Sequence, residues 1–382
     1  SLLRLSDRFA SVFTGLALTI AVAGAAFYLP DTASALDVFT AVLIIACPCA
    51  LTLAAPITLG TAMGQLGLRN IWLKNTATVV QLADVDAVVF DKTGTLTYGD
   101  LVLTRQGDPL PVDVNLAIRR VAASSSHPVS RALAGDMSDM ADEVDEGQQT
   151  IRGRALGYDV VLGSAQALRN EGYDIEDIPF AIVHAAVNGH YVGCWSAQSS
   201  VRHGIETSIQ RLHSDGVKTF LASGDTNREA ALFASVFAQS EMIFSASPET
   251  KRLLVEKLRG EGHHVLMMGD GLNDSVAMSS ADVAVAVTDA TATLVPACDV
   301  IIDGDSAHHI DALIHYSRTM KNFIFINLGV SVLYNAVGLS LAVSGMLTPL
   351  AAAVLMPVSN LTVIGIGVAA ARWFGRRAVW ES

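Results

Sequence analysis

A carboxylate that follows an apolar run and opens a polar, flexible loop is the first feature of this chain suited to chemistry; the loop reads Asp91-Lys92-Thr93-Gly94-Thr95-Leu96-Thr97. The run from Val85 to Phe90 predicts a buried strand, so Asp91 lies at its carboxyl end. Open α/β sheets bind ligands at that edge. Asp91 is therefore positioned to act on a ligand, although an isolated aspartate could also simply cap the turn.

A second polar loop follows a second apolar run further along the chain. His264 to Met268 predicts another buried strand, which leads into Gly269-Asp270-Gly271-Leu272-Asn273-Asp274. Two carboxylates and an amide on a glycine-rich turn suit Mg²⁺, which prefers oxygen ligands and usually keeps several waters and a phosphate oxygen. This loop is therefore a candidate Mg²⁺ site.

The first loop resembles, at all seven positions, the phosphorylation motif of the P-type ATPases. The resemblance implies that Asp91 attacks the γ-phosphate of ATP and becomes an aspartyl phosphate, a form of covalent catalysis. The second loop resembles the hinge motif of the same family. The implied catalytic residues of the two loops are Asp91, Lys92, Thr93, Asn273 and Asp274, and the implied Mg²⁺ ligands are Asp91, Thr93 and Asp270.

Two segments between these loops also match the family. Ser223-Gly224-Asp225 is similar to its Thr-Gly-Asp motif, and the serine keeps a hydroxyl for a phosphate contact. Lys251, in Ser247-Pro248-Glu249-Thr250-Lys251, stands where the family keeps a phosphate-binding lysine. The alternative for Lys251 is an ordinary solvated lysine on a helix.

Composition points to a membrane. Hydrophobic residues make up 51% of the chain and charged residues 16%, against roughly 25% charged in a typical soluble protein. The apolar residues gather in stretches close to the roughly 20 residues that span a bilayer. These are Phe9 to Leu29, Val38 to about Gly60, Phe323 to Ser344 and Pro349 to Ala371.

Basic residues flank the four stretches on one side only, which marks that side as cytoplasmic. They are Arg4, Arg8, Arg69, Lys74, Arg318, Lys321, Arg372, Arg376 and Arg377. The opposite connections, 30–37 and 345–348, contain no lysine or arginine. We expect a multi-pass protein in the lipid of a cell membrane, of the bacterial inner-membrane kind, with residues from about Ile71 to His315 in the cytosol.

The second stretch contains Ala46-Cys47-Pro48-Cys49-Ala50. Proline lacks an N–H and clashes with the carbonyl four residues earlier, here that of Ile44, so we expect a kink at mid-membrane. Two thiols beside a kink are a soft ligand pair that selects Cu(I) or Zn²⁺ over Mg²⁺; two core cysteines with an incidental proline are the alternative. Beside the phosphorylation motif, the pattern resembles the metal-transporting P1B branch, whose signature is a transmembrane Cys-Pro-Cys.

The last two stretches contain no Asp, Glu, Lys or His. Zinc, cadmium and lead pumps of this branch typically place a lysine and an aspartate there, because a divalent ion needs compensating charge. The Tyr-Asn pair and the Met-x-x-Ser spacing resemble the copper subgroup instead. In that subgroup a second serine follows the spacing, where this chain has Asn360. The alternative for Met356 is a gap-filling core residue. The implied ligands of transported Cu(I) are Cys47, Cys49, Tyr334, Asn335, Met356 and Ser359.

The segment from Asp100 to about Gln198 looks like the nucleotide-binding insertion of this family. Its signature is Ser124-Ser125-Ser126-His127-Pro128, in which the histidine would orient ATP near the adenine; a surface histidine in a serine-rich turn is the alternative. The glutamate usually found five residues before that histidine is Ala122, and the usual Gly-x-Gly is Gly153-Arg154-Ala155. The implied nucleotide contacts are His127, Pro128 and Gly153, and we expect adenine binding to be weaker or differently built.

The expected fold class is an α-helical membrane domain joined to an α/β part, a doubly wound phosphorylation domain resembling the haloacid-dehalogenase fold with an inserted α+β nucleotide-binding domain. The expected limits are 1–70 for the helix pair with Cys-Pro-Cys, 71–100 with 199–315 for the phosphorylation domain, 101–198 for the insertion and 316–375 for the second helix pair. The family's actuator domain has no counterpart here, so we expect a fragment or truncated product. Ser130-Arg131-Ala132 resembles the copper pumps of cytochrome oxidase assembly.

The implied function is ATP-driven export of Cu(I) through an aspartyl phosphate, with Mg²⁺ and ATP as cofactors and a copper chaperone as the source of the ion. Three alternatives stay open: a zinc or cadmium pump, a copper-binding remnant that does not turn over, and a membrane-anchored phosphatase. The phosphatase motif typically has a second aspartate two positions on, where this chain has Thr93. A formal net charge of −12 without a basic stripe argues against nucleic acid as a partner.

Overall fold

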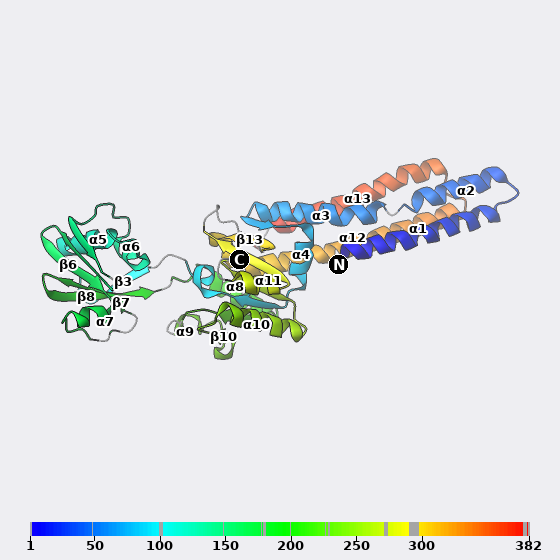
Figure 1. Cartoon of the computed structure of the whole chain (residues 1–382). Helices are drawn as coiled ribbons and strands as arrows, with labels where there is room; N and C mark the ends of the chain where they lie inside the picture. The colour runs from blue at the N-terminus through cyan, green and yellow to red at the C-terminus, as the bar shows by residue number, and fades with distance from the viewer. Residues whose placement is uncertain are drawn as a thin grey trace. The chain divides into compact units, whose positions relative to one another are not determined.

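The computed structural model describes residues 2–47, 49–98, 102–147, 149–176, 178, 181–198, 200–225, 227, 230–270, 274–289, 298–376 and 380. The chain divides into two compact units, one formed by 1–95, 203–225 and 234–382 and the other by 96–202 and 226–233. The first unit contains the long apolar helices and a mostly parallel sheet, and the second contains an antiparallel sheet (Figure 1).

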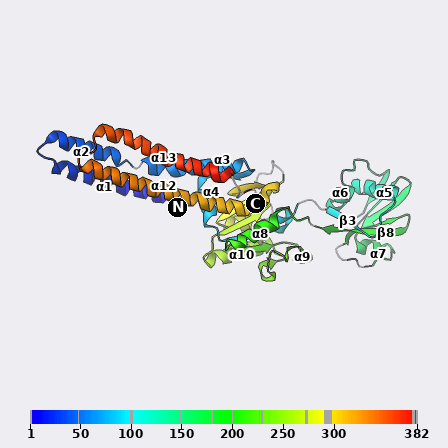
Figure 2. The ribbon, with the colours of Figure 1, turned by 180° about the vertical axis from the view of Figure 1, so that it is seen from behind.

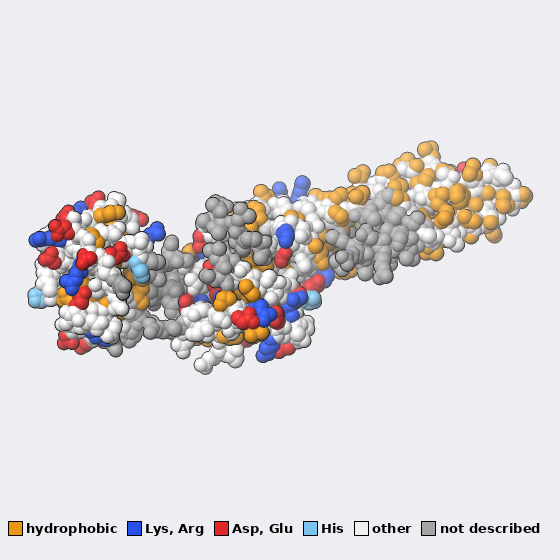
Figure 3. Space-filling view, in the orientation of Figure 1, with side chains coloured by type: hydrophobic (Ala, Val, Ile, Leu, Met, Phe, Trp, Pro, Cys, Tyr) orange, Lys and Arg blue, Asp and Glu red, His pale blue; other side chains and the backbone are white. Residues whose placement is uncertain are grey.

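The apolar part of the first unit is built from α1 (Leu2–Phe27), α2 (Thr32–Ile45), α3 (Cys49–Gly67), α12 (Ile310–Val343) and α13 (Pro349–Arg376). α3 packs along α13 and α1 along α2, and α12 runs beside α13 (Figure 2). Large apolar side chains such as Leu18, Val332 and Leu361 are exposed. Figure 3 shows hydrophobic side chains over much of the surface of these helices. So large an apolar surface is typical of a membrane-facing protein.

Two helices among the described residues are long and apolar enough to cross a membrane, the region Gly304–Val343 and α13. Gly15–Phe27 and Thr32–Ile45 are shorter apolar helices. α12 begins at Ile310, thirteen residues before the apolar stretch that the sequence shows, so one continuous helix joins the sheet to the apolar part.

The kink expected in the second apolar stretch is a break between two helices. α2 ends at Ile45 and α3 begins at Cys49. The carbonyl of Ile44 accepts a hydrogen bond from the N–H of Cys47 at 3.4 Å, although a proline four residues later offers it no N–H. The expectation of one bent helix over 38–60 is therefore wrong, because the chain ends one helix and starts another.

The sheet of the first unit has the order β1 (Ile71–Leu73), β13 (Val300–Asp303), β12 (Val283–Thr288), β11 (Val265–Gly269), β2 (Ala87–Phe90), β9 (Lys218–Ala222) and β10 (Met242–Ile243). Every pair is parallel except β1 with β13. β2 and β11 are wholly buried, as expected for parallel strands covered on both faces, and the two strands predicted from apolar runs, β2 and β11, are confirmed. The helices of this unit's α/β part are α4 (Thr76–Asp84), α8 (Ile205–Ser214), α10 (Pro248–Gly260) and α11 (Ser275–Ser280), whereas α9 (Ala230–Phe233) belongs to the second unit.

The second unit is a six-stranded antiparallel sheet in the order β3 (Val102–Gln106), β8 (His190–Gln198), β7 (Ala181–Val187), β6 (Tyr158–Gly163), β5 (Thr150–Ala155) and β4 (Glu143–Glu146). Its helices are α5 (Val112–Ala123), α6 (Pro128–Ala134) and α7 (Ala165–Asn170). Ile118 and Val121 of α5 pack on Leu162 and Trp195 of the sheet in one apolar cluster. This core holds α5 and α6 over the sheet, and the α+β character of the expected insertion is confirmed.

Candidate functional site

Asp91 follows β2 at the point where the strand order of the parallel sheet reverses. β2 pairs with β9 on one side and with β11 on the other, and the chain builds the sheet outward in both directions from there. The N–H of Asp91 donates to the carbonyl of Met268 at 2.8 Å, and the residue is 6% exposed. Ligand sites of open α/β sheets lie at such reversal points, so β2 presents this carboxylate where a ligand would bind.

Lys251 joins Asp91 to Asp274. Its ammonium donates to Oδ1 of Asp91 and to Oδ1 of Asp274, the latter at 2.6 Å. The three side chains are 7%, 8% and 1% exposed, in the order Lys251, Asp91 and Asp274. The alternative that Lys251 is a solvated helix lysine is therefore wrong.

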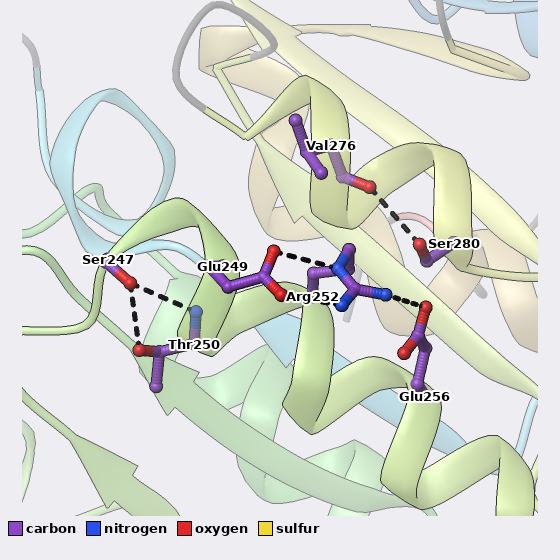
Figure 4. A network of polar contacts seen from close by, with 7 residues as sticks. All are labelled: Ser247, Glu249, Thr250, Arg252, Glu256, Val276 and Ser280. Carbon is purple, nitrogen blue, oxygen red and sulfur yellow. Dashed lines mark hydrogen bonds and ion pairs between the residues drawn. The ribbon is translucent and has the colours of Figure 1, made fainter.

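The start of α10 fixes the position of Lys251. Ser247 caps this helix, since its Oγ accepts from the N–H of Thr250 at 3.2 Å, and Pro248 occupies the first turn, where a missing N–H costs nothing. On the exposed face, Arg252 pairs with Glu249 at 2.6 Å and with Glu256 (Figure 4). These contacts stabilise α10, and the packing of Val255 and Leu258 against the sheet sets the rotation that turns Lys251 inward.

Burial and charge shift the acid–base properties of this triad. Burial and the nearby charge of Asp274 raise the pKa of Asp91 to about 6, although Lys251 opposes the shift. Burial also raises the pKa of Asp274, against Lys251 and with help from Asp270. Burial alone would lower the pKa of Lys251, but the two carboxylates outweigh it and the net shift is upward.

The same electrostatics fit a divalent cation. Three carboxylates lie close together here: Asp91, Asp270 and Asp274. The Lys251 ammonium donates to two of them, Asp91 and Asp274. Oδ2 of Asp274 is buried and has no hydrogen-bond partner among the described residues. An excess of carboxylate oxygen with one orphaned buried atom suits Mg²⁺.

Two glycines meet requirements of the acidic loops. Gly94 has φ +73°, a backbone conformation that strains any other residue, and a Cβ built on it would lie in ordinary contact, 3.4 Å from Cβ of Asp270. A Cβ on Gly269 would lie 2.5 Å from Oδ2 of Asp274, closer than any real contact. A side chain at Gly269 would therefore displace the Asp274 carboxylate within its own loop.

Asp225 ties the first loop to the Ser-Gly-Asp segment. Lys92 pairs with Asp225 at 2.7 Å, and the Thr93 hydroxyl donates to it at 3.0 Å. Burial raises the pKa of Asp225, but the hydrogen bonds from Lys92 and Thr93 outweigh it and the net shift is downward. Ser223 lies beside this contact, across Gly224, and its Oγ accepts from the N–H of Asp225 at 3.1 Å. The structure thus brings these predicted residues together with Asp91, whereas Asn273 lies outside the described residues.

A separate cavity of about 480 Å³ opens beside His127 in the second unit. His127 caps α6, since its Nδ1 accepts from the N–H of Val129 at 3.3 Å. Pro128 begins α6, and its side chain lies outside the described residues. Ile151, Leu162 and other apolar side chains form the walls.

Gly153 lies in β5, and its contact with a nucleotide stays a prediction. It is not among the residues lining the cavity beside His127, and a Cβ there would lie 2.9 Å from Val121 of α5. Its glycine is explained by the packing of β5 against α5. Gly163 and Glu146 do line the cavity, and the sequence analysis missed both because neither belongs to a local motif.

The membrane residues expected to bind copper lie on three helices that meet near the helix break. The Tyr334 hydroxyl on α12 donates to the carbonyl of Leu355 on α13 at 3.0 Å, next to Met356. Ile45, at the end of α2, lines a cavity of about 370 Å³ together with Tyr334 and Leu355. Ser359 is buried, with 6% of its surface exposed, whereas Asn335 and Met356 are half-buried.

The two cysteines are less fully described. Cys47 is half-buried and disulfide-bonded, which differs from the free thiolate that we expected. Cys49 is the first residue of α3, and its side chain lies outside the described residues. A role for Cys47 in binding copper requires the reduced form, because the thiolate is the metal ligand.

Known proteins resemble the chain over almost all of its length. A family model for haloacid dehalogenase-like hydrolases matches residues 85–282. The chain is 32% identical over 372 residues to the nitrogen fixation protein FixI of Rhizobium leguminosarum bv. viciae, covering 94% of this chain and 48% of that protein. It is also 32% identical over 394 residues to a copper-exporting P-type ATPase of Mycobacterium tuberculosis, covering 98% and 51%.

A solved zinc-transporting PIB-type ATPase in its E2·Pi state has the same fold, with a TM-score of 0.76, 22% identity, and coverage of 97% of this chain and 63% of that one. The chain spans about half the length of the curated relatives that it matches. The strand order around Asp91, the match over 85–282 and these relatives agree with one another. The chain belongs to the haloacid dehalogenase-like hydrolase family, and it is homologous over nearly its whole length to cation-transporting P-type ATPases.

Proposed function

We propose that this chain takes part in the ATP-driven export of Cu(I) across a cell membrane, through an aspartyl phosphate at Asp91. The observation that carries the proposal is the buried bridge of Lys251 between Asp91 and Asp274 at the reversal point of the sheet. A nucleophile, a cation and further carboxylates at a ligand-binding edge are the parts that phosphoryl transfer needs.

Phosphoryl transfer follows from the chemistry of Asp91. A carboxylate oxygen attacks the γ-phosphorus of ATP, an O–P bond forms, and the bond to the β,γ-bridging oxygen breaks, so that ADP leaves with the electron pair. Water later attacks the same phosphorus, which releases inorganic phosphate and restores the carboxylate. Asp91 must be ionised for the first step, and its raised pKa keeps it near the boundary at pH 6.

The neighbouring residues would neutralise the negative charge of the site and hold the reacting groups in place. Lys251 already balances Asp91 and Asp274, and the same ammonium would balance the oxygens of a transferred phosphoryl group. Asp91, Asp270 and the Thr93 carbonyl would hold Mg²⁺, which when bound supplies further positive charge. The Thr93 hydroxyl itself is engaged by Asp225, which supports a positioning role for that pair and for Lys92.

For ATP, the proposed site is the cavity beside His127, whose apolar walls suit a planar base. We assign nucleotide binding to 101–198 and phosphorylation to 71–100 with 199–315. The helix pairs 1–70 and 316–375 would cross the membrane, with the phosphorylation and nucleotide-binding parts in the cytosol.

Copper selectivity rests on ligand chemistry. Thiolates and a thioether are soft ligands, and the apolar stretches of α12 and α13 carry no charged side chain, so a monovalent soft ion needs no further compensation there. The name of the Mycobacterium tuberculosis relative, a copper exporter, supports the same ion. A copper chaperone is the proposed donor of the Cu(I) ion, since soft ligands such as thiolates bind Cu(I) preferentially.

Cu(I) binding to the purified chain in detergent, kept reduced, tests the proposed cargo by competition with a chromogenic chelator. We expect tight binding that is lost when Cys47→Ser and Cys49→Ser are combined, and weak binding of Zn²⁺. Tight Zn²⁺ binding that survives the double substitution would overturn both the site and the ion.

A further inference from the structure

The nucleotide cavity contains a carboxylate that no sequence motif assigns. The position where related pumps carry a glutamate is Ala122, which is fully buried in the apolar cluster under α5 and does not line the cavity. Glu146 lines the cavity instead, from the end of the edge strand β4. This acid reaches the cavity from a different element of the fold.

Ser125 fixes Glu146 beside His127. The Ser125 hydroxyl donates to Oε1 of Glu146 at 2.5 Å, and Oγ of Ser125 accepts from the N–H of His127 at 3.1 Å. Ser125 is 4% exposed, so water competes little for either bond. Oε2 of Glu146 accepts no hydrogen bond from the residues that the structure describes, and it remains available to a ligand.

The remaining lining suits a flat, partly apolar group. Ile151, Leu162 and Val183 supply apolar surface, and the ring of His127 supplies an aromatic edge. Gly147 and Gly163 also line the cavity. A nucleobase fills such a slot with its faces against apolar side chains and its polar edge toward whichever hydrogen-bonding group the slot offers.

We propose that Glu146 recognises the nucleobase, because its Oε2 accepts a hydrogen bond from the exocyclic amine of a 6-aminopurine. The inference rests on the proposed binding of ATP in this cavity. An ionised carboxylate has only acceptor oxygens, so it attracts an amine and repels a carbonyl at the same position. The cavity therefore selects adenine over a 6-oxopurine, and Ser125 is the positioning residue that aims the carboxylate.

Nucleotide binding to the full-length chain carrying Asp91→Asn, which removes turnover, tests this role by equilibrium dialysis with radiolabelled ATP and ITP. ITP differs from ATP only at this edge of the base, where a carbonyl replaces the 6-amine and N1 carries a proton. We expect the unmodified cavity to prefer ATP by about tenfold, as for one charge-assisted hydrogen bond. Glu146→Gln, whose amide can donate as well as accept, should reduce the preference to within about twofold.

Glu143→Gln is the matched control, because it makes the same change on the same exposed strand at a residue that does not line the cavity. It should keep the preference for ATP. Ser125→Ala should reduce the preference without removing ATP binding, since the base still fills the slot while the carboxylate is no longer fixed.

Three outcomes would overturn the inference: no preference in the unmodified cavity, a preference that survives Glu146→Gln, or an equal rise in affinity for both nucleotides in that variant. The last would mean that Glu146 only repels phosphate. Formation of the phosphoenzyme from ATP by the chain with Asp91 intact is measured in parallel, so a failed base preference is distinguishable from a failure of the proposed function.

Discussion

At the scale of residues, the site depends on the mutual compensation of buried charges. Asp91, Lys251 and Asp274 are each too deeply buried to stay charged alone, and each is stabilised by the others. This coupling makes Lys251 the residue whose removal should disturb the site most. A single substitution of Lys251 therefore tests both the stability of the chain and its phosphorylation.

We predict that Lys251→Met lowers the free energy of unfolding by about 3 kcal/mol, because two buried carboxylates lose their counter-charge. It should also reduce phosphorylation at least about a hundredfold. Lys257→Met is the control on the same helix, since Lys257 is 72% exposed and 4.0 Å from its acidic partner. Thermal unfolding and incorporation of label from ATP measure both effects, and equal behaviour of the two variants would contradict the account.

The pH dependence of that deficit has a definite sign. Because the pKa of Asp91 is raised from 3.8 to about 6, the folded chain holds this proton more tightly than the unfolded chain, and acid stabilises the site. Removing Lys251 raises the pKa values of Asp91 and Asp274 further. We predict that the stability deficit of Lys251→Met, in Mg²⁺-free buffer, is large at about pH 8 and shrinks toward about pH 5. A deficit that grows on acidification would show that the lost contact is not this ion pair.

Local motifs could predict some of these residues but not others. Asp91 and Asp270 stand at the ends of apolar runs, so strand periodicity alone places them at a sheet edge. The burial of Lys251 depends on the rotation of α10, and Glu146 reaches its cavity through strand pairing of β4 with β5. Such contacts join residues distant in sequence, and no local pattern records them.

At the scale of elements, α12 links the sheet to the apolar helices. Its first turn is anchored by Asp311, which accepts from the Ser208 hydroxyl at 2.8 Å and pairs with Arg211 at 3.4 Å. Further along, Arg318 donates to the carbonyl of Val85 at 2.8 Å, and Lys321 pairs with Asp84. These contacts tie α12 to α8 and to the segment that leads into β2.

We predict that Asp311→Ala destabilises the chain by about 2 kcal/mol, since it leaves a buried serine hydroxyl without its acceptor and removes the Arg211 pair. Asp305→Ala is the control, because Asp305 is exposed in the preceding turn. Thermal unfolding monitored by circular dichroism gives the comparison. A loss below about 0.5 kcal/mol for Asp311→Ala would mean that the anchor does not hold α12.

Element boundaries could be predicted only in part. The Asn188-Gly189 turn has φ +49° and +80°, as the hairpin signal between β7 and β8 requires. Hydropathy missed the first thirteen residues of α12, because these face the sheet and not lipid. It also merged α2 and α3 into one span, since an apolar run continues through a break that only backbone hydrogen bonding resolves.

At the scale of the whole molecule, the proposed copper site draws its residues from three helices, α3, α12 and α13, and from the segment between α2 and α3. Tyr334 reaches the backbone of α13 beside Met356, and the end of α2 lines the same cavity as Tyr334. The proposed copper assignment therefore depends on the combined contribution of soft ligands from the segment between α2 and α3, from α3 and from α13.

We predict that Met356→Leu weakens Cu(I) binding by about tenfold while changing stability by less than about 1.5 kcal/mol, because leucine keeps the volume but lacks the thioether. Met346→Leu is the control, as Met346 is 76% exposed at the turn before α13. Chelator competition and thermal unfolding measure the two quantities. Unchanged Cu(I) affinity in Met356→Leu would assign Met356 to packing.

The central claim is that Asp91 accepts the phosphoryl group of ATP, and radiolabel from [γ-³²P]ATP tests it most directly. With Mg²⁺, the purified chain should form an acid-stable, hydroxylamine-labile phosphoenzyme, since an acyl phosphate is cleaved by that nucleophile. Asp91→Asn should incorporate no label, because the amide keeps the shape and loses the nucleophile. Label that persists in Asp91→Asn, or that resists hydroxylamine, would contradict the account.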